Sequence, residues 1–216
     1  MIARRRLCAG VLSVIVLLGV GIALFTIRQP ILRAAGWALV VNDRVEPADV
    51  VIVMVDAHGA GVLEAADLVH SGVATRVAVF DESPDTIVER EFMRRGIPYE
   101  DEGARSVRYL RALGVQTVDL IPTYVAGTED EGPVLADWCD QHGFRSVVVV
   151  STSDHSRRLR RVLRRSMKGR PTRFAARSAH YSGFDPNRWW HSRRGIRTEV
   201  VELEKLLLDV LRHPFS

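Results

Sequence analysis

The sequence predicts an α/β fold, in which a mainly parallel sheet lies between two layers of helices, preceded by one N-terminal transmembrane helix. One observation behind this prediction is a long apolar run near the N-terminus. Another is a pair of short apolar runs rich in valine, Asp49–Val55 and Val147–Val150, which are typical of strands buried on both faces of a parallel sheet. Amphipathic helical segments follow these runs, as a parallel strand–helix–strand unit requires.

The N-terminal segment predicts a membrane anchor. Residues 1–6 form a basic leader, residues 7–27 the apolar run, and residues 28–45 a juxtamembrane connector. About 20 apolar residues cross a bilayer, whereas the apolar part of a signal peptide usually has about 7 to 15. The leader's Arg4, Arg5 and Arg6 outweigh Arg28 and Arg33, so the N-terminus is expected in the cytoplasm. Cleavage stays an alternative, because small residues of the kind used at cleavage sites follow the run at Ala34, Ala35, Gly36 and Ala38.

Residues 46–213 are predicted to form one α/β domain. The expected strands are Asp49–Val55, Arg76–Phe80, Thr117–Ile121, Val147–Val150 and Thr172–Ala176. The expected helices are Val62–His70, one ending near Arg95, Ser106–Leu113, Pro133–His142, His155–Lys168 and Thr198–Leu211. The alternation predicts a Rossmann-like three-layer sandwich, with ligands beyond the carboxyl ends of the strands where the strand order reverses. The apolar stripe of the last helix is expected to dock on the sheet.

The turn after Val150 is the first candidate site. Ser151 and Ser153 precede a helix N-terminus that carries His155, Arg157 and Arg158. Unpaired backbone N–H groups and the helix dipole favour an anion there, and a histidine can move a proton. A capped helix with solvated arginines explains the same residues, and the sequence leaves both interpretations open.

The turn after Val55 is the second candidate site. It contains Asp56, His58 and Gly59, and glycine allows close approach of a ligand to the backbone. Asp56 is also explained as a capping carboxylate. If the two strands are neighbours, these residues lie near His155 and Arg158. Glu129, Asp130 and Glu131 precede the helix predicted at Pro133, where acids favour the helix dipole, so structural capping is their default explanation.

Composition narrows the classes of protein that fit. A chain of 216 residues that is 47% hydrophobic can bury one domain plus a short appendage. The basic face of the helix His155–Lys168 has no interleaved aromatic residues, so we expect a solvated face and no nucleic-acid partner. Cys8 lies in the apolar run and Cys139 in a predicted helix, so no disulfide is expected. Absence of G-x-S-x-G and G-x-G-x-x-G motifs argues against a serine hydrolase and a dinucleotide enzyme.

Over roughly Pro47–Arg212 the sequence resembles the YdcF/SanA/ElyC family. The family's glycine-rich turn after the first strand has its counterpart in Val50–Gly61, and its GVP-like motif in Gly96–Pro98. The T-x-E-N-like motif corresponds to Thr128–Gly132, and the V-T-S-x-x-H-x-x-R-A-like motif to Val150–Arg158. The family's paired tryptophans correspond to Trp189–Trp190, and its E-x-x-K-L helix to Glu202–Leu206. The sequence departs from the pattern where Val55 and Asp56 replace a glycine pair, Phe80–Glu82 replaces S-G-G, and Asp130 and Glu131 replace an acid and an amide.

The resemblance implies a single-pass protein of the bacterial inner (plasma) membrane, with a YdcF-like domain of Rossmann-like fold on the outer or periplasmic side. It also implies a link to envelope integrity and to peptidoglycan or lipid-carrier metabolism. A soluble relative is associated with binding S-adenosylmethionine. Neither association names a reaction, and the sequence does not identify a cofactor.

Two hypotheses follow for the function. The first is an envelope protein that contacts the lipid bilayer through residues 7–27 and binds a phosphorylated envelope precursor. The second is a hydrolase or transferase acting on phosphorylated lipid-carrier or cell-wall intermediates, with His155 as acid/base, Arg158 on the phosphate, and Asp56 with Asp130 or Glu131 on a divalent cation. The residues expected to bind the ligand are Asp56, His58, Gly59, Thr128, Ser151, Ser153, Arg157 and Arg158.

Overall fold

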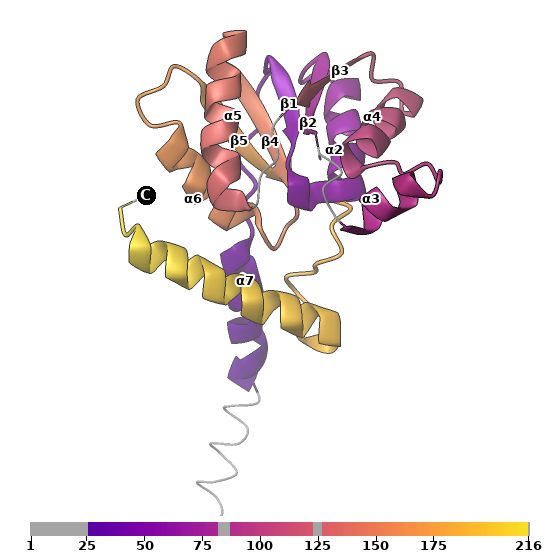
Figure 1. Cartoon of the computed structure of the whole chain (residues 1–216). Helices are drawn as coiled ribbons and strands as arrows, with labels where there is room; N and C mark the ends of the chain where they lie inside the picture. Colours follow the sequence, from indigo (N-terminus) through magenta and orange to yellow (C-terminus); the bar gives the residue numbers. More distant parts are fainter. Residues whose placement is uncertain (1–25, 82–86, 123–126, 216) are drawn as a thin grey trace, which may run out of the picture.

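The computed structural model describes residues 26–81, 87–122 and 127–215. Its centre is a five-stranded, fully parallel sheet in the order β3-β2-β1-β4-β5 (Figure 1). The strands are β1 Val50–Val53, β2 Arg76–Phe80, β3 Thr117–Ile121, β4 Ser146–Ser151 and β5 Arg173–Ser178. The prediction of an α/β fold with a parallel sheet is therefore confirmed. The strand order reverses between β1 and β4, which pair directly, with Val53 opposite Val150.

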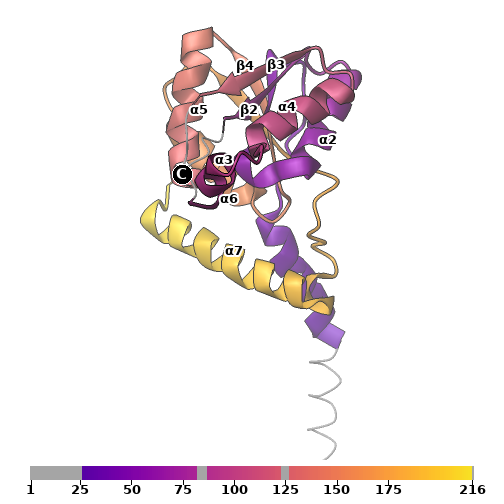
Figure 2. The same cartoon turned by 45° about the vertical axis from the view of Figure 1, so that its right-hand side comes forward.

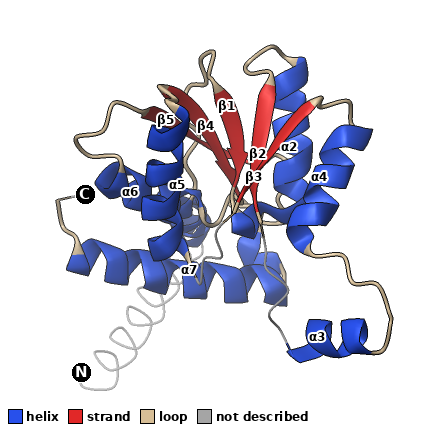
Figure 3. Ribbon diagram, turned by 45° about the horizontal axis from the view of Figure 1, so that its top comes forward, coloured by secondary structure: helices blue, strands red, loops and turns tan. Residues whose placement is uncertain are grey.

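Helices cover both faces of the sheet, as Figure 3 shows. Along β1, Val50 and Ile52 face the core shared with α5 Thr128–His142 and α6 Ser156–Ser166. Val51 and Val53 face the core shared with α2 His58–His70 and α4 Glu102–Ala112. Side chains alternate between the faces of a strand, so the unbroken apolar runs in the sequence fill two cores at once. Cys139, on α5, is buried and free.

Several helices begin earlier than the sequence predicted. α2 begins at His58 rather than Val62, α4 at Glu102 rather than Ser106, and α5 at Thr128 rather than Pro133. Pro133 lies inside α5, where the missing N–H removes only one hydrogen bond near the helix start. The acids ahead of Pro133 are consequently in the first turn of α5 and not in a loop. Helix α3 Ile87–Arg94 has no buried residue and stands at the edge of the molecule (Figure 3); most of the acidic turn predicted before it lies outside the described residues.

Helix α7, Arg193–Arg212, is placed differently from the prediction. It was expected to dock its apolar stripe on the sheet, but it lies beyond the carboxyl ends of the strands, against α6 and the short 3₁₀ helix η2 Trp189–His191. Its buried residues are Glu199, Glu202 and Asp209. The stripe prediction is wrong because α7 packs against η2 and α6 rather than on the sheet, and much of its apolar surface is exposed.

The basic face of α6 is one of the partners of α7. Arg161 and Arg165 form ion pairs with Asp209, and Arg160 pairs with Asp43 at 2.8 Å. The expectation of a solvated basic face is therefore wrong for these three arginines.

The predicted connector is helical over residues 26–39. Leu39 and Val40 pack against Phe184 and, on α7, against Leu203 and Leu206. The predicted leader and nearly all of the predicted transmembrane segment, residues 7–27, lie outside the described residues. Within the described part of the chain, no helix has the length and apolar character needed to cross a membrane.

Candidate functional site

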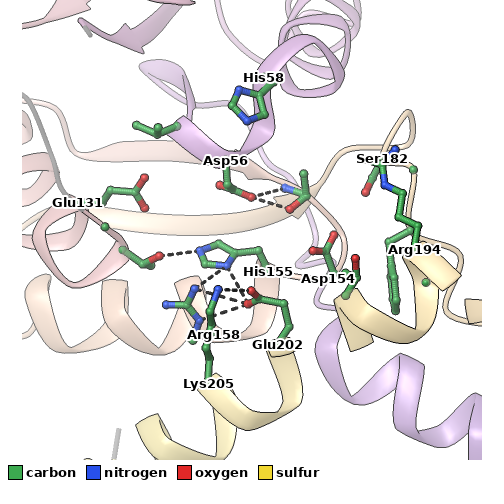
Figure 4. A pocket seen from close by; sticks show the side chains of 18 of the residues that line it. Asp56, His58, Glu131, Asp154, His155, Arg158, Ser182, Arg194, Glu202 and Lys205 are labelled. Atoms are coloured by element: carbon green, nitrogen blue, oxygen red, sulfur yellow. Dashed lines mark hydrogen bonds and ion pairs between the residues drawn. The ribbon is translucent and has the colours of Figure 1, made fainter. Parts of the chain in front are cut away.

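A cavity of about 740 Å³ lies at the reversal of strand order. The turns after β1 and β4 form one side of it, the start of α5 another, and α7 the side opposite the sheet, so that Asp56, Thr128, His155 and Glu202 come together from four elements (Figure 4). The sequence-based expectation that the turns after Val55 and Val150 are neighbours is confirmed, because β1 and β4 are adjacent.

His155 is the central buried group of the cavity. Only 6% of its surface is exposed. Its Nε2 atom lies 2.9 Å from the Thr128 hydroxyl, and its Nδ1 atom lies 3.3 Å from a Glu202 carboxylate oxygen. Arg158 approaches the same Nδ1 atom at 2.9 Å. A proton on Nδ1 favours the contact with Glu202, and a lone pair there favours the contact with Arg158, so the two contacts belong to different tautomers.

Glu202 holds this cluster together electrostatically. Burial on its own would raise the pKa of Glu202, but hydrogen bonds from His155 and Lys205 and the charge of Arg158 outweigh burial and lower the pKa to about 2. Lys205 donates to Glu202 at 2.6 Å, and Arg158 lies 3.5 Å from it. Glu202 is therefore ionised across the physiological range, and two of the cavity's cations are already paired.

Two acidic side chains, Asp56 and Glu131, line the cavity near His155. One oxygen of Asp56 accepts hydrogen bonds from the backbone N–H and the hydroxyl of Thr152, at 2.9 and 2.6 Å. The other oxygen of Asp56 is buried without a hydrogen-bond partner among the described residues, as is Oε2 of Glu131. Burial and the nearby Asp56 charge raise the pKa of Glu131 to about 7. Asp56 thus caps the neighbouring turn with one oxygen, while its other oxygen is buried without a hydrogen-bond partner among the described residues.

The opposite end of the cavity is formed by Asp154, Ser182, Arg194 and Thr198. Figure 4 shows Ser182 and Arg194 on one side of Asp154, and His155, Arg158 and Lys205 on the other. Burial, with smaller effects of Asp56 and Glu202, raises the pKa of Asp154. Arg194 lines the cavity, and none of the hydrogen bonds or ion pairs described for residues 26–81, 87–122 and 127–215 involves its side chain.

The structure brings six of the sequence-predicted site residues to the cavity: Asp56, His58, Thr128, Glu131, His155 and Arg158. His58 lies 3.8 Å from Glu102 on α4, on the far side of Asp56 from His155 (Figure 4).

Five other predicted site residues do not line the cavity: Gly59, Ser151, Ser153, Arg157 and Asp130. Arg157 donates hydrogen bonds to the carbonyl groups of Trp37, Ala38 and Val40 at the end of the helix over 26–39. The Ser151 hydroxyl bonds to the Thr152 carbonyl, and the Ser153 N–H donates to Ser182. These contacts are within the fold, so the structure gives Arg157, Ser151 and Ser153 structural partners.

The predicted cation ligands are only partly assembled. Asp56 and Glu131 both face the cavity, but Asp130 is exposed outside it. No group of three or more His, Cys, Asp or Glu side chains in the described ranges is arranged to hold a metal ion. Cation binding by Asp56, Asp130 and Glu131 stays a prediction.

The site residues expected from the sequence do not include Asp154, Arg194, Thr198, Glu202 or Lys205, which line the cavity. Thr198, Glu202 and Lys205 are spaced by four and three residues on α7, which places them on one helix face. This polar stripe is the signal in the sequence, but the apolar residues of the same helix give a stronger pattern and predict a different packing face.

Comparisons with models of protein families, with curated proteins and with solved structures found no match for this chain. The resemblance to the YdcF/SanA/ElyC family stays a prediction from the sequence motifs.

Proposed function

We propose that the protein is a membrane-anchored envelope protein that binds a phosphate-bearing or other anionic cell-envelope precursor in the cavity between β1, β4 and α7, and so supports envelope and peptidoglycan integrity. The observation that carries the binding proposal is Arg194, a cavity-lining cation with no described ion pair. Ser182 and Thr198, which carry hydroxyl groups, line the same cavity. Guanidinium and hydroxyl groups are suited to phosphate oxygens. The apolar run at residues 7–27 supports the membrane part of the proposal.

The charges along the cavity favour one orientation of such a ligand. Arg158 and Lys205 both pair with the Glu202 carboxylate, whereas no ion pair is described for Arg194, so Arg194 is the better position for the phosphate. The carboxyl groups of Asp56 and Glu131 at the other end of the cavity disfavour a second anion there and suit neutral hydroxyl groups of a sugar. A phosphorylated sugar group, with its phosphate towards Arg194, is complementary to both ends.

A thermal-shift measurement on the full chain in detergent micelles tests this proposal. The probes are inorganic phosphate, a uridine diphosphate sugar and a short-chain polyprenyl phosphate. We expect at least one phosphate-bearing probe to raise the unfolding temperature of the wild type but not of Arg194→Ala. The matched control Arg188→Ala, which changes an exposed arginine outside the cavity, should respond like the wild type. An equal shift in Arg194→Ala, or no shift with any probe, contradicts the proposal.

One specific observation favours a second candidate, a hydrolase or transferase acting on phosphorylated envelope intermediates. Thr128, His155 and Glu202 form a hydrogen-bonded series in which a hydroxyl contacts Nε2 and a carboxylate contacts Nδ1. In the reaction that we propose, the Thr128 oxygen attacks the phosphorus atom while His155 Nε2 takes the hydroxyl proton. The bond from phosphorus to the leaving oxygen breaks, that oxygen receives the proton from His155, and water then releases phosphate from Thr128.

Release of inorganic phosphate from p-nitrophenyl phosphate tests the enzymatic candidate. Thr128→Val removes the hydroxyl but keeps the branched shape, so it should abolish turnover, whereas Thr128→Ser should retain it. Turnover by Thr128→Val at the wild-type rate would exclude Thr128 as the nucleophile.

A further inference from the structure

Helix α7 has a second surface that the cavity does not use. Ile196, Val200, Leu207 and Leu211 are 43%, 58%, 59% and 68% exposed. Their spacings of four, seven and four residues place them on one helix face. The cavity-lining Thr198, Glu202 and Lys205 lie on the opposite face, because each residue turns the helix by about 100°. One helix therefore closes the cavity with its polar face and presents an apolar face outward.

The outward face lies close to the point where the predicted anchor enters the domain. Figures 1 and 2 both show α7 running across the helix over residues 26–39 rather than along it. Trp189, just before α7, donates a hydrogen bond to the Leu32 carbonyl at 2.8 Å. The predicted anchor ends at Ile27, and five residues of helix rise about 7.5 Å. The polar headgroup layer on each side of a bilayer is roughly 5 to 8 Å thick, so the start of α7 is at headgroup level if the anchor spans the bilayer.

The charges around the apolar face suit an anionic surface. Arg193 and Arg197 on α7 are exposed beside the face, against one exposed acid near it, Glu204. Amphipathic helices that lie in a membrane interface combine an apolar face with arginine or lysine beside it. If this face of α7 is in contact with water, its four large apolar side chains stay solvated.

We propose that the outward face of α7, defined by Ile196, Val200, Leu207 and Leu211, lies on the surface of an anionic phospholipid bilayer. This inference rests on the membrane anchor of the proposed function and goes beyond it, because it adds a second membrane contact that fixes the domain's orientation. The cavity on the other side of α7 is then held at the headgroup layer. A ligand whose phosphate belongs to a membrane lipid can reach Arg194 there without leaving the bilayer.

Lipid quenching of a site-specific fluorophore tests the orientation in the full chain. Cys139→Ala removes the buried thiol, and the anchor is labelled at native Cys8. In a Cys8→Ser background, Leu207→Cys labels the outward face of α7. Gln141→Cys labels exposed α5 near the amino ends of the strands, at the far edge of the sheet. Each labelled chain is placed in vesicles of phosphatidylethanolamine and phosphatidylglycerol that contain nitroxide-labelled lipid.

We expect nitroxide lipid to remove most of the fluorescence at positions 8 and 207 and little at position 141. Quenching at position 8 but not at 207 overturns the contact of α7 while leaving the anchor intact. Absence of quenching at position 8 overturns both the anchor and this inference. If the unlabelled Leu207→Cys chain forms an intermolecular disulfide and the labelled chain is not quenched, a second copy of the chain is the occupant, and this also overturns the proposal.

Discussion

Glu199 on α7 is expected to make the stability of the protein fall as the pH rises. Its side chain is fully buried, and neither carboxylate oxygen has a hydrogen-bond partner among the described residues. Burial and the charge of Asp154 raise the pKa of Glu199 to about 7 from an ordinary value of 4.5. The folded state therefore binds more protons than the unfolded state between these two values, and stability declines as the pH rises through that window. A shift of this size corresponds to a loss of about 3 kcal/mol above pH 7, as an upper limit.

The substitution Glu199→Gln removes the titration while preserving shape. Denaturant unfolding of the full chain in detergent micelles, followed by tryptophan fluorescence at pH 5 and pH 8, measures the effect. Between these values, the wild type should lose up to about 3 kcal/mol more than Glu199→Gln. The exposed Glu204→Gln on the same helix should behave like the wild type. If Glu199→Gln and the wild type lose the same stability between pH 5 and pH 8, Glu199 is not protonated in the folded state and the reasoning is refuted.

Three further substitutions test the contacts that position the site, each by denaturant unfolding of the full chain. Glu202→Gln should lower the free energy of unfolding by about 3 kcal/mol at pH 7, because Arg158 and Lys205 lose their carboxylate partner. The pKa of Glu202 in the folded state is about 2, so this stabilisation should be lost as the pH falls from 4.5 towards 2. The variant and the wild type should then have the same stability. Arg157→Met should lower the free energy of unfolding by about 2 to 3 kcal/mol, because the carbonyl groups at the end of the helix over 26–39 lose their hydrogen-bond donors. The control Arg164→Met changes an exposed arginine and should have little effect. Equal losses of stability in the two variants would mean that the hydrogen bonds of Arg157 are not formed. Gly132→Ala should lower the free energy of unfolding by about 1 to 3 kcal/mol, because the new Cβ atom would lie 2.5 Å from the Ser166 hydroxyl. The control Gly59→Ala places its Cβ atom where nothing lies within 4 Å, so it should stabilise α2 by up to about 1 kcal/mol. If Gly132→Ala leaves the stability unchanged, α5 and α6 can move apart freely.

The strands could be predicted from the sequence because their signal is local. Arg76–Phe80 and Thr117–Ile121 have the predicted boundaries. The starts of α2, α4 and α5 were missed by four or five residues, because polar first turns lack the apolar periodicity on which the prediction depended. The neighbouring turns around Asp56 and His155 followed from the general rule for parallel sheets, which is why part of the site could be predicted before the fold was known.

The sequence by itself determined the alternation of strands and helices, the two-faced burial of the valine-rich strands, and the position of the turn at His155 beyond a buried strand. Only the tertiary structure decided what surrounds His155. Its contacts with Thr128 and Glu202 span 27 and 47 residues of sequence, and no local pattern records such distant pairings. The tertiary structure also decided which face of α7 is buried. Glu199, Glu202 and Asp209 can be buried because the fold brings cationic side chains and His155 to Glu202 and Asp209 and raises the pKa of Glu199. Whether a residue is buried therefore depends on the partners that the fold supplies as well as on its own hydrophobicity.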